Sequence, residues 1–143
     1  MKISQKPDLL LLREALEASW DEKTSYLAVQ KEGIPALGQC YPTAWVVQHF
    51  FPKTEIIKGN VWNGKEIEVH FWNGLFVDGD LYHIDLSWQQ FPAHSSVKVF
   101  EILDRKLLND SKGTNTRCEI LLNRVIKYVN LHNKKRNTLK PIF

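Results

Sequence analysis

Cysteine is scarce in this sequence, and the scarcity excludes several kinds of protein. Only Cys40 and Cys118 occur in 143 residues, far apart and in unlike surroundings. Two such residues do not make the disulfide framework of a small secreted domain. The metal-binding spacings C-x-x-C and H-E-x-x-H are missing as well. We therefore expect two free thiols and predict neither a metal site nor another cofactor.

A long apolar segment is also missing. The early cluster from Leu9 to Leu12 is followed at once by Arg13 and Glu14, and it is too short to span a bilayer. The residues before it lack the apolar region of a signal peptide. Together with the reduced cysteines, these features favour a cytoplasmic protein without a membrane partner.

Neither sign of charge dominates. Nineteen basic residues stand against sixteen acidic ones, a net charge of +3, and no nucleic-acid recognition module accompanies them. We expect no nucleic-acid partner and interpret the late basic residues as a solvated tail from about residue 131. Without repeats or linkers, residues 1–143 are predicted to form a single domain. The sequence makes no prediction of oligomeric state.

The most informative stretch is Gly38-Gln39-Cys40, a loop followed by an apolar helix over Tyr41–Phe50. Gly38 interrupts any helix from upstream, whereas Pro42 suits a first helical turn because its missing N–H loses no hydrogen bond there. Cys40 is thereby placed at the positive end of a helix, which favours the thiolate. A lone cysteine is more often a small buried hydrophobic residue, so position alone does not make it a nucleophile.

Three strands are predicted after this helix, over Thr54–Trp62, Lys65–Trp72 and Asp80–Trp88. Asn63-Gly64 and Asp78-Gly79 are signals for two-residue turns, so the strands should be antiparallel. A two-residue turn at Asp78-Gly79 places Trp72 opposite Asp85. His70 and Asp85 are then diagonal neighbours on one sheet face, within reach of each other. The alternation puts Ile67, Val69 and Phe71 on the opposite, apolar face.

The remaining elements complete an α+β fold. Asp8 is a suitable N-cap for a helix over Leu9–Ser19, and Val97–Leu103 is a further edge strand. Thr116 and Glu119 match a capping box for a last helix, on whose core face Cys118 lies. We expect N-terminal helices and a cysteine-bearing helix packed on a small antiparallel sheet.

These motifs resemble two families. Gly38-Gln39-Cys40 with Ala44, and His70-Phe71-Trp72, resemble the G-x-C-x-x-x-A and H-x-W motifs of the transglutaminase-like (papain-like) cysteine-enzyme core. Asp85-Leu86-Ser87 stands where that core has D-P-T. More closely, the chain from Leu9 to Tyr128 resembles the small bacterial YunG-like proteins, also through Gln90-Phe91. The resemblance implies a fold and a site, with no established substrate.

The motifs and the derived pairing together suggest a triad of Cys40, His70 and Asp85 that attacks an amide or thioester carbonyl. The enzyme would be a hydrolase or transferase acting on a peptide, a protein or a small amide or acyl compound. Gln39 and Trp72 are candidates for oxyanion support or substrate binding. Two alternatives stay open: a non-catalytic binding domain on the same fold, and, less favoured, a metal site that includes His83.

Overall fold

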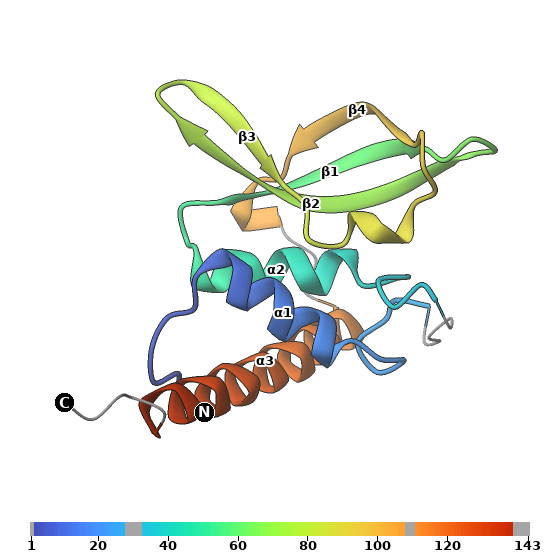
Figure 1. Ribbon diagram of the computed structural model, residues 1–143. Coiled ribbons are helices and arrows are strands. Elements are labelled where there is room, and N and C mark those ends of the chain that lie inside the picture. Colours follow the sequence, from blue (N-terminus) through green and yellow to red (C-terminus); the bar gives the residue numbers. More distant parts are fainter. Residues whose placement is uncertain (1, 28–32, 108–110, 139–143) are drawn as a thin grey trace.

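The computed structural model describes residues 2–27, 33–107 and 111–138, and it has the predicted α+β class (Figure 1). Its elements, in chain order, are α1 (Leu9–Ser19), α2 (Cys40–Phe50), β1 (Glu55–Trp62), β2 (Ile67–Val77), β3 (Asp80–Ile84), the 3-10 turn η1 (Trp88–Gln90), β4 (Ser96–Ile102), the 3-10 turn η2 (Arg105–Leu107) and α3 (Lys112–Thr138). None of the helices within these residues is long and apolar enough to cross a membrane.

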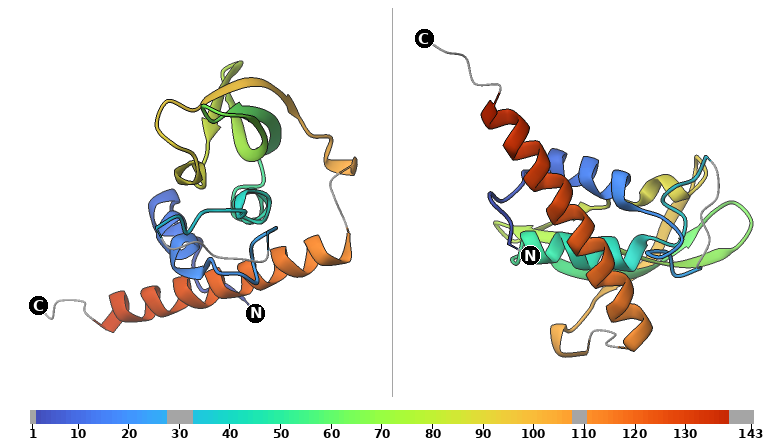
Figure 2. Two further views of the ribbon diagram at one scale, coloured as in Figure 1. Left: turned by 90° about the vertical axis from the view of Figure 1, so that its right-hand side faces the viewer. Right: turned by 90° about the horizontal axis from the view of Figure 1, so that it is seen from below.

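Helix α2 lies between the sheet and the other two helices (Figures 1 and 2). It contacts β2 on one side and α3 on the other, while α1 packs along α3. The main core forms where the three helices meet, from Leu12 and Leu16 of α1, Val46 and Val47 of α2, and Leu121, Val125 and Val129 of α3. Burial of this apolar stripe holds α2 in place, and with it the cysteine at its start.

Both ends of α3 differ from the prediction. The helix begins at Lys112, where the Thr114 N–H donates to the Ser111 hydroxyl at 3.3 Å, so Thr116 lies inside the helix and not at its cap. It continues to Thr138, whereas the sequence suggested a frayed tail from about residue 131. Docking of the N-terminal segment explains this, since the Asn130 amide donates to the Lys2 carbonyl at 2.9 Å and accepts from the Ser4 N–H at 2.8 Å.

The sheet is antiparallel with strand order β3-β2-β1-β4, and β4 is an edge strand as predicted. The turn at Asp78-Gly79 has two residues, with φ of 52° and 86°, and Val77 pairs with Asp80. The first hairpin is different, because Trp62 pairs with Ile67 and leaves a loop of residues 63–66. The Asn63 side chain stabilises this wider loop by accepting from the N–H groups of residues 65 and 66, both at 2.9 Å.

The burial of β2 reverses the predicted apolar face. Ile67 and Val69 are 49% and 55% exposed, whereas His70 is fully buried and Trp72 is 4% exposed. Strand β3 ends at Ile84 and not at Trp88, and the chain beyond it turns into η1. Phe91, after η1, contacts the His70 ring at 4.7 Å between centroids. The segment with η1 and Phe91 therefore covers the face of β2 that carries His70 and shields it from water.

Candidate active site

Cys40 is the first residue of α2, and a tight loop brings it there. Gly38 has φ of 73°, and a Cβ at this position would lie 2.3 Å from the Ser25 hydroxyl, so both the conformation and the space require glycine. Because the first N–H groups of a helix have no partner within it, the Cys40 N–H lies beside its own thiol at the positive end of α2. The side chain is partly exposed.

The structure brings His70 and Asp85 together. His70 Nε2 lies 2.7 Å from Asp85 Oδ2, so the predicted proximity of the two side chains is observed. Asp85 Oδ1 in turn accepts from the Ser87 N–H at 3.1 Å, which holds the carboxylate at the end of β3. The imidazole therefore has one nitrogen committed to Asp85, while the other, Nδ1, lies on the opposite side of the ring, 3.4 Å from the Gln90 amide.

The charge of His70 depends on both neighbours. Burial lowers its pKa, but the hydrogen bond with Asp85 and the interaction with the Cys40 thiol outweigh burial and raise the pKa from 6.5 to about 9. At neutral pH the ring is accordingly a cation between a carboxylate and a sulfur. Cys118 is a contrasting thiol: it is 1% exposed on the core face of α3, and burial raises its pKa to about 12.

Trp72 supports His70 from within the protein. The indole is stacked on the imidazole at 5.5 Å between centroids, and its Nε1 donates to His83 Nδ1 at 2.8 Å. It is not part of the cavity wall around Cys40. His83, the fourth residue of the metal alternative, thus has one ring nitrogen engaged by Trp72. Within the described ranges, the His, Cys, Asp and Glu residues form no group of three or more suited to a metal ion.

Gln39 has its donors engaged away from the thiol. Its side-chain Nε2 donates to the Asp21 carbonyl at 2.9 Å, and its backbone N–H donates to the Ala36 carbonyl at 3.1 Å. The side chain is fully buried, and its Oε1 has no hydrogen-bond partner. In this arrangement Gln39 anchors the cysteine loop to the segment after α1 through its bond to the Asp21 carbonyl.

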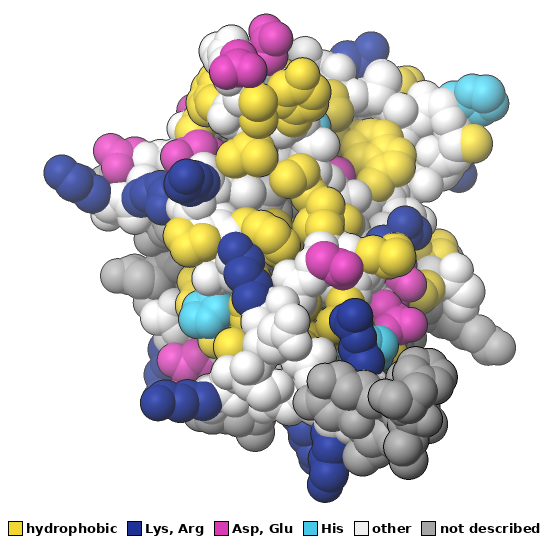
Figure 3. All heavy atoms as spheres, turned by 60° about the vertical axis from the view of Figure 1, so that its left-hand side comes forward, with side chains coloured by type: hydrophobic (Ala, Val, Ile, Leu, Met, Phe, Trp, Pro, Cys, Tyr) yellow, Lys and Arg dark blue, Asp and Glu magenta, His cyan; other side chains and the backbone are white. Residues whose placement is uncertain are grey.

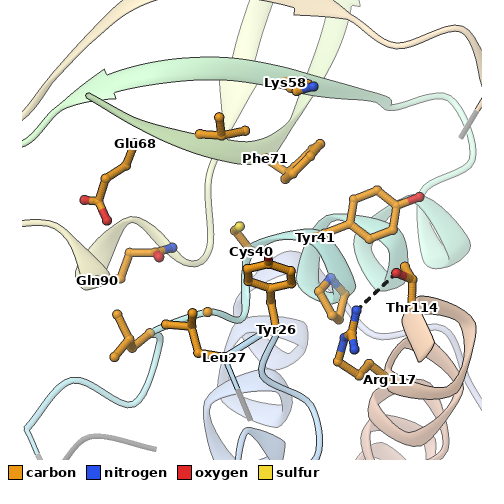
Figure 4. Close-up of a pocket in the computed structure, with 14 residues that line it drawn as sticks. Tyr26, Leu27, Cys40, Tyr41, Lys58, Glu68, Phe71, Gln90, Thr114 and Arg117 are labelled. Atoms are coloured by element: carbon orange, nitrogen blue, oxygen red, sulfur yellow. Dashed lines mark hydrogen bonds between the residues drawn. The ribbon is translucent and has the colours of Figure 1, made fainter. Parts of the chain in front are cut away.

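Gln90 is the site residue to which the sequence assigned no role. Its Nε2 lies 3.4 Å from His70 Nδ1 and donates to the Ser87 carbonyl at 3.0 Å. It also lines the cavity beside Cys40 (Figure 4). The only sequence signal for it was its place in the Gln90-Phe91 motif, because a 3-10 turn after a short strand has no pattern that predicts which way its side chains point.

The thiol opens into a cavity of about 500 Å³. Its walls come from the segment after α1, the cysteine loop, α2, the sheet, η1 and α3. They include Tyr26, Leu27, Leu37, Gly38, Tyr41, Pro42, Lys58, Glu68, Val69, Phe71, Gln90, Thr114 and Arg117 (Figure 4). On the outer surface, hydrophobic side chains gather over the sheet, as the upper part of Figure 3 shows. The cavity is large enough for a small acyl compound or a short stretch of peptide.

A family comparison covers the part of the chain that holds these residues. A model described as "YunG protein" matches residues 8–130, a stretch that contains Cys40, His70, Asp85 and Gln90. The chain belongs to the YunG family. No curated protein and no solved structure is significantly similar to it. Family membership therefore identifies the chain without assigning a reaction, and the chemistry has to be inferred from the site.

Proposed function

We propose that this YunG-family chain is a cysteine-dependent enzyme whose triad of Cys40, His70 and Asp85 attacks an amide or thioester carbonyl. The observation that carries the proposal is the buried His70 ring, which is bonded to Asp85 at 2.7 Å and interacts with Cys40 beside a cavity. A thiolate beside an imidazolium is the reactive form of such a nucleophile. Burial of a charged histidine costs free energy unless the charge is paired. Buried titratable groups with shifted pKa values are typical of functional sites, so we ascribe a function to His70.

The reaction follows from these positions. The Cys40 sulfur attacks the carbonyl carbon, and the C–N or C–S bond breaks as His70 gives its proton to the leaving amine or thiol. The resulting acyl thioester is then attacked by water or by an acceptor amine, and His70 takes back a proton. Asp85 keeps the ring oriented with Nδ1 toward the sulfur. Peptidase, amidase, deamidase and acyl- or amine-transfer activity all use these steps.

Two groups are suitable for stabilising the oxyanion. The Cys40 N–H begins α2 and has no partner within the helix. The second is the Gln90 amide, which lines the cavity and lies 3.4 Å from His70 Nδ1. We assign this role to Gln90 in place of Gln39, and we assign to Trp72 the support of the imidazole in place of substrate binding.

A transglutaminase-like (papain-like) core is the finer assignment of fold that we propose. Its support is the order of a helix that begins at a cysteine, followed by a strand that carries His70 and an antiparallel neighbour that ends immediately before Asp85. A nucleophilic thiol also needs a reducing compartment to stay free, so the proposal is consistent with a cytoplasmic location.

The test uses a generic acyl donor, p-nitrophenyl acetate, with the full chain. We expect a burst of nitrophenolate equal to the enzyme concentration and one acetyl group on Cys40 by peptide mass mapping. Cys40→Ala should abolish the burst, whereas Cys118→Ala, the matched control thiol, should leave it unchanged. His70→Gln and Asp85→Asn should each slow acylation by roughly a hundredfold or more, because general acid–base catalysis contributes about that much.

The alternative is a non-catalytic binding domain on the same fold. In a binding domain the reactivity of Cys40 would not depend on His70 or Asp85. The acylation rate of Cys40 would therefore be the same in wild type, His70→Gln and Asp85→Asn. Equal rates in three variants that circular dichroism shows to be folded would reject the enzyme and favour the binding domain.

A further inference from the structure

Two basic side chains line the cavity without forming an ion pair among the described residues. Arg117 of α3 and Lys58 of β1 both line it, and neither forms an ion pair within the described part of the chain, where the ion pairs use other basic residues. The Arg117 guanidinium donates to the Thr114 hydroxyl at 3.1 Å and lies 5.9 Å from the Tyr26 ring centroid. These neutral neighbours position the guanidinium, which has no ion-pair partner among the residues that the structure describes.

Such a cation is suited to an anionic ligand. Arg117 is half-buried, and the cavity that it lines together with Cys40 also includes the apolar Pro42 and Tyr41. A guanidinium that is partly withdrawn from water forms stronger hydrogen bonds with a carboxylate than an exposed one does, and its planar fork matches the two carboxylate oxygens.

The side of Cys40 on which Arg117 lies indicates which part of a substrate it meets. Arg117 lies on one side of the thiol, and Gln90 lies on the other (Figure 4). His70 is on the Gln90 side, because the Gln90 amide is 3.4 Å from its Nδ1. The leaving group must be near His70 to receive its proton, so the acyl part extends toward Arg117. Glu68 is on the leaving-group side, where its charge would repel an anion.

We propose that the acyl part of the substrate ends in a carboxylate that Arg117 binds, so that the enzyme acts on acyl groups of the dicarboxylate type and not on neutral ones. This inference rests on the function proposed above, since it takes the reacting carbonyl to lie at Cys40. Lys58, from the neighbouring wall of the cavity, adds to the positive potential that attracts such a substrate.

The experiment measures alkylation of Cys40 by matched reagents, so that no turnover is needed. N-iodoacetyl amino acids with spacers of one to six carbons are compared with their carboxamides; in each reaction the sulfur displaces iodide. We expect one spacer length at which the carboxylate reagent reacts about tenfold faster than its carboxamide, a ratio typical of one charge-assisted hydrogen bond. In Arg117→Gln, the carboxylate-to-carboxamide rate ratio at this preferred spacer should fall close to the ratio measured with the shortest spacer. The shortest reagent cannot reach residue 117.

Two controls separate Arg117 from the general charge of the protein. Lys127→Gln removes the same charge from an exposed position of the same helix, and it should leave the preferred spacer and the ratio unchanged. The shortest reagent keeps its carboxylate near His70, so its ratio measures the attraction by the imidazolium alone. Added salt should lower the preference for the carboxylate in wild type, because the ion pair forms partly in water.

The outcomes distinguish this inference from the proposed function. Rapid alkylation of Cys40 with the same ratio at every spacer length, or with a ratio that Arg117→Gln does not change, overturns the carboxylate inference and leaves the nucleophile in place. Alkylation of Cys40 by all reagents no faster than that of an unfolded thiol overturns the proposed function and, with it, the inference. A ratio that Lys127→Gln lowers as much as Arg117→Gln also rejects a specific site.

Discussion

Replacing Asp85 by asparagine should make the stability of the protein less dependent on pH. Asp85 Oδ2 is 2.7 Å from the fully buried His70, and it is the stronger of the two partners that raise the histidine pKa. Asparagine keeps the shape of the side chain, and its oxygen can still accept from the Ser87 N–H. It removes the negative charge, so the variant favours a neutral ring that accepts a hydrogen bond from the new amide.

The magnitude follows from the pKa of His70, which is about 9 in the folded chain against 6.5 for an ordinary histidine. A raised pKa stabilises the fold fully below the unfolded value, and this contribution is lost as the pH rises through the folded value. At 1.36 kcal/mol per unit, the difference corresponds to a loss of roughly 3 kcal/mol between about pH 6.5 and pH 9. In Asp85→Asn most of this loss should be absent.

The assay is urea unfolding followed by tryptophan fluorescence, from about pH 6 to pH 9.5, a range that brackets the titration of His70. The destabilisation caused by Asp85→Asn should be about 2 kcal/mol larger at the acidic end than at the alkaline end. Asp80→Asn is the matched control, because it removes a carboxylate from an exposed position on β3, the strand that leads to Asp85. Its effect should not change over this range.

One result would refute this reasoning. If Asp85→Asn lowers the free energy of unfolding by the same amount at every pH, then His70 does not gain a proton from its pairing with Asp85. The contact between the two side chains would then be an ordinary neutral hydrogen bond. The proposed thiolate–imidazolium state of the site would lose its main physical support.

Two further predictions concern packing and the second thiol. Gly59→Ala should destabilise the chain by about 2 kcal/mol in urea unfolding, because the new methyl group would lie 2.4 Å from the Trp72 ring and 2.9 Å from the Val99 carbonyl. Gly113→Ala, in the first turn of α3, would place its methyl group at an ordinary contact distance of 3.4 Å from the Arg117 guanidinium, so it should instead stabilise the chain by about 0.5–1 kcal/mol; equal effects of the two would contradict this packing. Cys118, whose pKa burial raises to about 12, should stay unlabelled by iodoacetamide in the folded chain and react only in urea, and labelling it ahead of Cys40 would reverse our assignment.

Local signals were sufficient to predict α1, α2 and the second hairpin. Asp8 caps α1 through a bond from the Leu11 N–H at 2.8 Å, and Cys40 begins α2 after the glycine loop, as expected. The turn at Asp78-Gly79 determines which residues of its two strands pair. That register brings His70 and Asp85 together, so this part of the candidate site could be predicted from turn type and alternation alone.

Features that depend on competition between neighbouring residues were less predictable. The capping pattern at Thr116 was a valid local signal, but Ser111 lies five residues earlier and caps the helix first. Strand β3 ends at Ile84 because Asp85 accepts from the Ser87 N–H and turns the chain away from the sheet. The length of α3 depends on Asn130 and its contacts with the N-terminal segment, which no pattern within the helix reveals.

The sequence by itself determined which residues are near one another along the second hairpin and where the cysteine helix begins, because turns and caps depend on a few adjacent residues. Only the tertiary structure decided which face of β2 is buried. The alternation predicted burial of Val69, yet the segment with η1 and Phe91 covers His70 instead. Burial depends on what packs against a strand from far along the chain, and the same packing brings Gln90 and Arg117 to opposite sides of Cys40.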